Sequence, residues 1–170
     1  MSALLWRVFV GPMVLTMRVL HIVLGVFWAG TMIFNAVFLF PAIRDAGPDG
    51  AKIVAGLTRR RFLTVMPIVA ALSIAAGLWL YWFDSAGFQP AFMHSSMGMA
   101  LGLGAVAALV AFVLGIAIVR PAMAKAAVLG QDPAQQAAAQ ALRLRAASMN
   151  RVIAVLLVLA AVAMAIARYA

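Results

Sequence analysis

Residues 19–40 of the chain read VLHIVLGVFWAGTMIFNAVFLF, a run without a charged side chain. A helix needs about 20 predominantly apolar residues to cross the hydrocarbon core of a bilayer. This run is long enough, and we expect its helix to end at Pro41 and Arg44, because proline disfavours a continuing helix and arginine marks the membrane surface. The stretch therefore predicts a transmembrane helix.

Three further runs have the same character, at about residues 62–83, 92–119 and 148–168. We expect the third to stop at Arg120-Pro121, and the fourth to include Arg151 with its side chain snorkelling to the surface. The chain has 170 residues, of which 67% are hydrophobic and only 10% charged, whereas a soluble domain carries about 25% charged residues. The sequence therefore predicts a single all-α domain, an up-down bundle of four transmembrane helices in a lipid bilayer.

The cations are concentrated in two of the three connections between these helices. The first and third connections hold, or directly adjoin, Arg44, Lys52, Arg59, Arg60, Arg61, Arg120, Lys125, Arg143, Arg145 and Arg151. The second connection contains no cation, and its one charged residue is Asp84. By the positive-inside rule, connections one and three are cytoplasmic and both termini are outside, in the inner membrane of a bacterium. Despite the net charge of +9, we exclude nucleic acid as a partner, because the cations are scattered at helix ends rather than gathered on one face.

Two segments outside the spans also have a helical or interfacial pattern. Residues 1–10 contain Leu4, Leu5 and Trp6 before Gly11-Pro12, which indicates a short interfacial segment. Asp132-Pro133 is typical of a helix start, and it predicts a cytoplasmic helical extension over residues 133–148. That extension is either a solvated stalk or a docking surface for another membrane protein.

Only two histidines occur, His21 and His94. Both belong to helices that run from outside to inside, 23 residues before Arg44 and 26 residues before Arg120. At 1.5 Å per residue their heights differ by only about 5 Å. Helices one and three are diagonal in an up-down bundle, so the two imidazoles are expected to approach a central ligand from opposite sides.

Each histidine is followed four residues later by a glycine, Gly25 or Gly98, on the same helix face. A glycine one turn deeper leaves open space beside the ligand, as a flat macrocycle requires. Arg18 lies one turn before His21, where its guanidinium can meet an anionic propionate. Because haem iron takes histidine as an axial ligand, the pattern predicts a bis-histidine haem b near the outer face.

Two other interpretations remain open. Met17, Met93 and Met97 accompany the histidines, and thioether with imidazole suits copper, so the same end is also a candidate copper site. Alternatively the histidines are interfacial, the methionines fill the core, and the chain is a non-catalytic accessory subunit. Gly98-x-x-x-Gly102 permits close helix packing, either inside the bundle or in a homo-oligomer. No catalytic residue is assigned.

The stretch Arg18–Gly30, with Phe40-Pro41-Ala42, resembles the first helix of the CopD/HemJ-like bacterial membrane proteins. Arg60-Arg61-Phe62 and Ala76-Gly77-Leu78 resemble their second helix. The resemblance implies a four-helix unit with a histidine in helix one and either haem or copper chemistry.

The two branches of that family differ in what they imply. HemJ-type proteins are haem-binding protoporphyrinogen oxidases with a histidine in helix one and a lysine in helix three. His21 matches the first residue, but residues 92–119 contain no lysine. CopD-type proteins are linked to copper uptake and are usually larger. The choice between the branches stays open at the level of the sequence.

Overall fold

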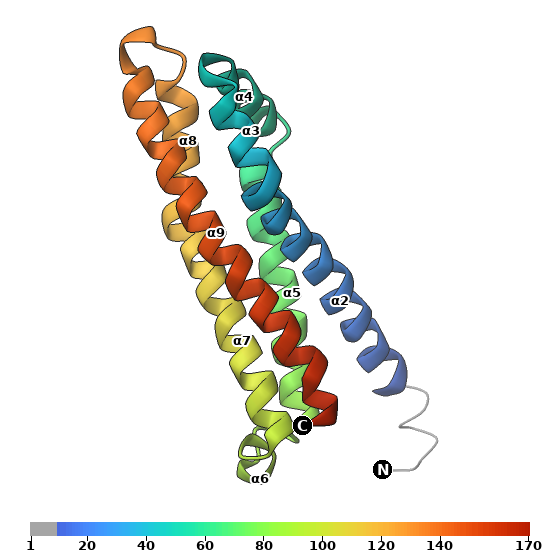
Figure 1. Ribbon diagram of the computed structural model, residues 1–170. Coiled ribbons are helices and arrows are strands. Elements are labelled where there is room, and N and C mark those ends of the chain that lie inside the picture. Colours follow the sequence, from blue (N-terminus) through green and yellow to red (C-terminus); the bar gives the residue numbers. More distant parts are fainter. Residues whose placement is uncertain (1–9) are drawn as a thin grey trace.

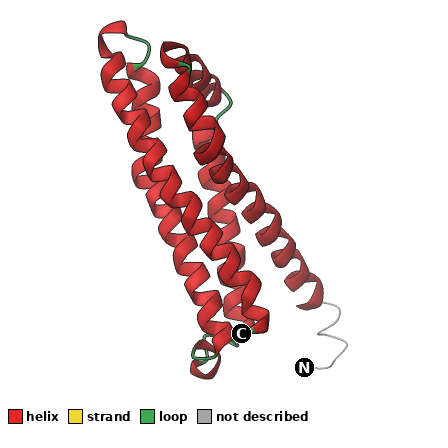
Figure 2. Ribbon diagram, in the orientation of Figure 1, coloured by secondary structure: helices red, strands yellow, loops and turns green. Residues whose placement is uncertain are grey.

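The computed structural model describes residues 10–170, apart from the side chain of Pro48. Throughout this part of the chain helices are joined by short loops, and no strand is present (Figure 2). Four helical stretches are long and apolar enough to cross a membrane: Gly11–Asp45, Phe62–Asp84, Ser96–Leu129 and Pro133–Tyr169. The prediction of an all-α, four-helix transmembrane protein is confirmed. The interfacial segment expected around Leu4 to Trp6 lies outside the described residues.

The four stretches form an up-down bundle (Figure 1). Their longest helices are α2 (Gly11–Phe34), α5 (Phe62–Asp84), α7 (Ser96–Leu114) and α9 (Gln136–Ile166). α2 packs mainly along α5, and α7 packs along α9. The start of α2 and the end of α9 lie at the same end of the bundle, which we call the outer end; the opposite, inner end carries the first and third connections (Figure 1).

The first and third helices continue past the prolines at which the sequence predicted their ends. A single turn of π-helix, called a π-turn below, lies at Asn35–Leu39 and precedes α3 (Phe40–Asp45). A second π-turn, at Gly115–Val119, precedes α8 (Arg120–Leu129). A proline lacks an N–H donor and its ring collides with the carbonyl one turn earlier. The wider π-turn just before Pro41 and before Pro121 accommodates both effects. The first helical stretch therefore passes Pro41 but ends at Asp45, next to the expected Arg44, whereas the predicted end at Arg120-Pro121 was wrong.

The third span also starts later than residue 92. A short helix, α6 (Pro90–Met93), is followed by a turn at His94 and Ser95, and α7 begins at Ser96. The Ser95 hydroxyl oxygen caps α7 by accepting a 3.0 Å hydrogen bond from the backbone N–H of Gly98. His94 consequently lies between two helices rather than inside a long one.

At the inner end the chain forms a small helical core of its own. The first connection contains a helix that the sequence reading treated as a loop, α4 (Gly50–Arg59). Its Val54 is buried against Ile43 of α3, Met123 of α8 and Ala146 of α9. This packing holds the cationic connections together as one compact inner end.

The extension before the fourth span is part of this inner end. The Asp132 carboxylate accepts a 2.9 Å hydrogen bond from the backbone N–H of Ala134 and so caps the helix start at Pro133. From Gln136 onward α9 is continuous, and its residues Ala139 and Ala146 are fully buried. One face of the extension is therefore packed within the protein and is not a free stalk.

Candidate functional site

A cavity of about 530 Å³ lies among the four spans in the outer half of the bundle, and we call it the outer cavity. Its volume is in the range of about 300–1,000 Å³ that is usual for cofactor sites. Most of its wall is aliphatic, with contributions from α2, α5, α7 and α9. Its polar lining residues are Arg18, His21, Ser73, Tyr81 and Asp84.

His21 reaches this cavity from α2 and is fixed to α5 by a reciprocal pair of hydrogen bonds. Its Nδ1 lies 2.8 Å from the carbonyl oxygen of Ser73, and the Ser73 hydroxyl donates at 3.1 Å to the carbonyl oxygen of His21. Because a carbonyl oxygen can only accept, Nδ1 must carry the proton. In the neutral ring Nε2 then keeps its lone pair, and this is how most metal-binding histidines are held.

A glycine on α5 makes this position of the imidazole possible. A Cβ atom at Gly77 would lie 2.6 Å from Cε1 and 2.7 Å from Nδ1 of His21, closer than atoms can approach. A Cβ atom at Gly25 would lie 3.3 Å from the Ser73 hydroxyl oxygen. Gly25 lines the outer cavity as the sequence suggested, and together the two glycines bring α2 and α5 into close contact.

Polar groups gather at the outer end of the cavity. Arg18 is exposed on α2, one turn before His21, and Asp84 is exposed at the end of α5. The Tyr81 hydroxyl donates to the carbonyl oxygen of Gly98 at 2.9 Å and also contacts the sulfur of Met93 at 3.2 Å. The cavity thus has an apolar interior and a polar rim, which suits an amphiphilic ligand.

The structure does not bring His94 to this cavity. His94 is exposed, and its Nδ1 lies 2.8 Å from the carbonyl oxygen of Pro90 in its own turn. Gly98 opens no space beside it, because a Cβ atom there would collide with the carbonyl oxygen of Phe92. The predicted pair of equivalent histidines is therefore absent, and the expected open space is absent beside both: Gly25 faces the Ser73 hydroxyl at close range, and Gly98 faces the Phe92 carbonyl.

The methionines expected to complete a copper site are also outside the cavity lining. Met17 is half-buried on α2, Met97 is exposed on α7, and Met93 contacts the Tyr81 hydroxyl. Within residues 10–170, no group of three or more His, Cys, Asp or Glu side chains could hold a metal ion. The methionine that does line the outer cavity is Met164, on α9.

Sequence reasoning identified His21, Gly25 and Arg18 but missed Ser73, Gly77 and Met164. Ser73 and Gly77 form a small-residue pair four positions apart on α5, a spacing that permits close helix contact in membranes. That pattern was the available signal for the surface on which His21 rests. Nothing in the sequence distinguishes Met164 from the other methionines.

No family model, no curated protein and no solved structure matches the chain. Its function is therefore inferred from the chemistry of the outer cavity.

Proposed function

We propose that this protein binds haem b in the outer cavity, with His21 as an axial ligand, and acts in electron transfer or in redox chemistry on a membrane-soluble substrate. The observation that carries this proposal is a histidine with Nδ1 bound to a backbone carbonyl, and hence a free Nε2, in an apolar cavity of about 530 Å³. A b-type haem supplies an iron centre that exchanges single electrons.

The residues around the cavity fit such a group. Its aliphatic walls suit the faces of a porphyrin, and Arg18 at the rim suits a propionate carboxylate. Met164 lines the same cavity from α9, and its thioether would hold the iron together with His21, as histidine and methionine do in some cytochromes. In this arrangement Met164, rather than His94, is the second candidate ligand.

The resemblance of residues 18–30 to the first helix of CopD/HemJ-like proteins agrees with a ligand role for His21. Since the third helix continues as α8, it does contain a lysine, Lys125. Lys125 is exposed at the inner end and does not line the outer cavity. This placement favours electron transfer over a HemJ-type oxidase reaction.

Charge supports a bacterial inner-membrane location with the outer cavity on the periplasmic side. Most of the cations belong to the connections at the inner end, whereas the connection between α5 and α6, residues 85–89, contains none. By the positive-inside rule the inner end is cytoplasmic.

The decisive measurement is a reduced-minus-oxidised absorption spectrum of the protein purified after expression with ample haem. We expect a b-type band in the wild-type protein and in His94→Ala, and its loss in His21→Ala. A band that persists in His21→Ala contradicts the proposal. Loss of the band in both variants would instead support ligation by both histidines, as expected from the sequence.

Metal analysis of the same samples separates the alternatives. Copper is tested in the same way: if it co-purifies without haem, and its occupancy falls in variants of Met17, Met93 or Met97, the protein handles copper and the haem proposal is wrong. A colourless, metal-free protein that co-purifies with a larger membrane complex would identify an accessory subunit.

A further inference from the structure

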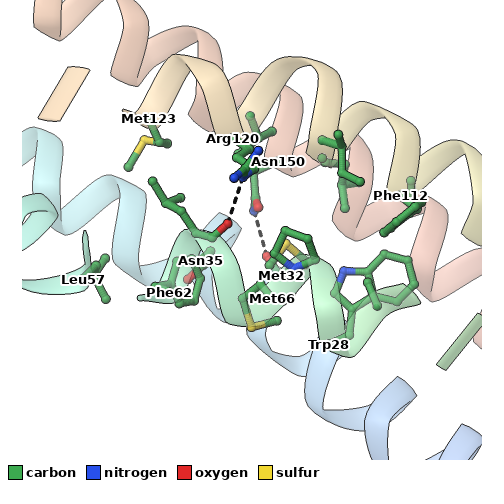
Figure 3. A pocket seen from close by; sticks show the side chains of 18 of the residues that line it. Trp28, Met32, Asn35, Leu57, Phe62, Met66, Phe112, Arg120, Met123 and Asn150 are labelled. Carbon is green, nitrogen blue, oxygen red and sulfur yellow. Dashed lines mark hydrogen bonds between the residues drawn. The ribbon is translucent and has the colours of Figure 1, made fainter. Parts of the chain in front are cut away.

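A second, smaller cavity of about 70 Å³ lies toward the inner end, and we call it the inner cavity (Figure 3). Its lining is mostly apolar but includes three polar side chains, Asn35, Arg120 and Asn150. Trp28 lines both the inner and the outer cavity, so its indole forms part of the wall between them.

Asn150 has an unsatisfied acceptor at this cavity. Only 1% of Asn150 is exposed, and its Nδ2 donates a 2.8 Å hydrogen bond to the carbonyl oxygen of Met32 (Figure 3). Because the atom facing that carbonyl must be a donor, the amide cannot be flipped. Its Oδ1 is left buried and without a hydrogen-bond partner in the described part of the chain. Buried acceptors without a partner are rare and indicate a missing donor.

Asn35 adds a second amide to the same cavity. It is 3% exposed, and it lines the inner cavity. It begins the π-turn of the first span, while Gly115, which begins the other π-turn, lines the cavity as well. π-turns occur frequently at functional sites. Two amides and two irregular turns thus meet at one place in an otherwise apolar bundle.

The size and surroundings of the inner cavity select its occupant. A buried water needs about 10–15 Å³ of accessible space and two to four polar partners, so a cavity of about 70 Å³ is large enough for water. Water can donate to Asn150 Oδ1, which an anion cannot do. Arg120, exposed at the inner end, lines the cavity and donates from Nε to the carbonyl oxygen of Leu63 at 3.1 Å (Figure 3).

We propose that the inner cavity binds water between Asn35 and Asn150. The water then lies inside the membrane, between the cationic inner end and Trp28, where the outer cavity begins. The inference is independent of haem binding, because none of its polar residues lines the outer cavity.

X-ray hydroxyl-radical footprinting of the protein in lipid nanodiscs tests this, since radicals formed from bound water oxidise neighbouring buried side chains. Met32 and Met66 line the inner cavity and are only 8% and 6% exposed. We expect both to be labelled in the wild-type protein, with oxygen derived from the solvent when H₂¹⁸O is used. Labelling of neither methionine would show a dry cavity and overturn the proposal.

Two variants assign the water to these residues. Asn150→Leu removes the unsatisfied acceptor and should abolish most labelling of Met32 and Met66. Gly115→Ala should lower it by occupying space, because the new Cβ would lie 3.9 Å from Ile153 Cδ1, an ordinary contact that leaves the fold intact. Arg151→Leu, at the exposed neighbouring position on α9, is the matched control and should leave it unchanged. Undiminished labelling in folded Gly115→Ala and Asn150→Leu contradicts the assignment.

Discussion

At the scale of single residues, the position of the His21 imidazole depends on two residues of α5, Ser73 and Gly77. Its position one turn after Arg18 and one turn before Gly25 is a local pattern. Its contacts with Ser73 and Gly77 depend on how α2 packs on α5, and no spacing within one helix specifies that. The tautomer that leaves Nε2 free follows only from the contact with Ser73.

Gly77→Ala tests this support without touching the proposed ligand. The new Cβ must displace the His21 imidazole, which is 2.6 Å away at Cε1, and so weaken its bond to the Ser73 carbonyl. Because the partner of a metal-binding histidine is worth about 10- to 100-fold in affinity, we expect haem affinity to fall by about that factor. Haem titration followed by absorbance measures it.

Gly30→Ala is the matched control on α2, because a Cβ atom there would have no neighbour within 4 Å. It should bind haem like the wild-type protein. Equal affinity in Gly77→Ala and Gly30→Ala would show that the position of the His21 ring does not matter for binding.

His94 was misplaced because an apolar run concealed a local break. Pro90 begins a short helix and Ser95 caps the next one, and both are ordinary helix-start residues. The hydropathy of residues 92–119 alone predicts a continuous helix, in which His94 would be a partner for His21. Local capping chemistry was the better guide here.

At the scale of elements, the four spans were predictable but their inner boundaries were not. Hydropathy identifies each span because a helix that crosses a bilayer must be predominantly apolar. It cannot reveal that the π-turns before Pro41 and Pro121 let the helices continue. The amphipathic pattern of α4 was present in residues 50–59, but the apolar spans on either side made the segment resemble a simple connection.

The start of the last helix should depend on Asp132. Hydrogen bonds from the Gln135 side chain and the Ala134 N–H lower the pKa of the Asp132 carboxyl below its usual value. The ionised carboxylate therefore stabilises the cap. This stabilisation is complete at pH values above the unfolded-state pKa of about 3.9, and it is lost as the pH falls through the lower pKa of the folded state. We expect Asp132→Ala to speed amide hydrogen exchange in residues 134–138 at neutral pH.

Gln131→Ala is the control for that change, since the Gln131 side chain donates back to the carbonyl oxygen of Ala127 in α8. The difference between Asp132→Ala and wild-type exchange should shrink in acid as the carboxylate is protonated. A difference that is absent at neutral pH, or that grows in acid, would rule out a capping role for the carboxylate.

At the scale of the whole molecule, the topology follows from charge and hydropathy together. The start of α2, the end of α9 and the turn after α5 lie at one end, opposite the packed connections (Figure 1). This arrangement places the only histidine of the outer cavity on the side away from most cations. The compartment of the proposed redox site therefore depends on the direction of insertion.

Reporter fusions measure that direction. Alkaline phosphatase fused after Ala170 should be active, and green fluorescent protein fused there should be dark, because the outer end is expected in the periplasm. Fusions at Gly130, between α8 and the start of the last helical stretch, should behave in the opposite way. The reverse pattern at both positions would move the outer cavity to the cytoplasmic face.

The π-turn in the first span has a consequence for helical phase. The buried positions along α2 and α3 are Trp28, Met32, Asn35, Phe40 and Ile43, at steps of four, three, five and three residues. One extra residue rotates everything beyond it by about 100° relative to an unbroken α-helix. A helical wheel drawn straight through this span therefore assigns the wrong face to its inner third. Deleting a single residue between Asn35 and Phe40 would leave steps of four, three, four and three, so an unbroken α-helix would keep Phe40 and Ile43 on the buried face.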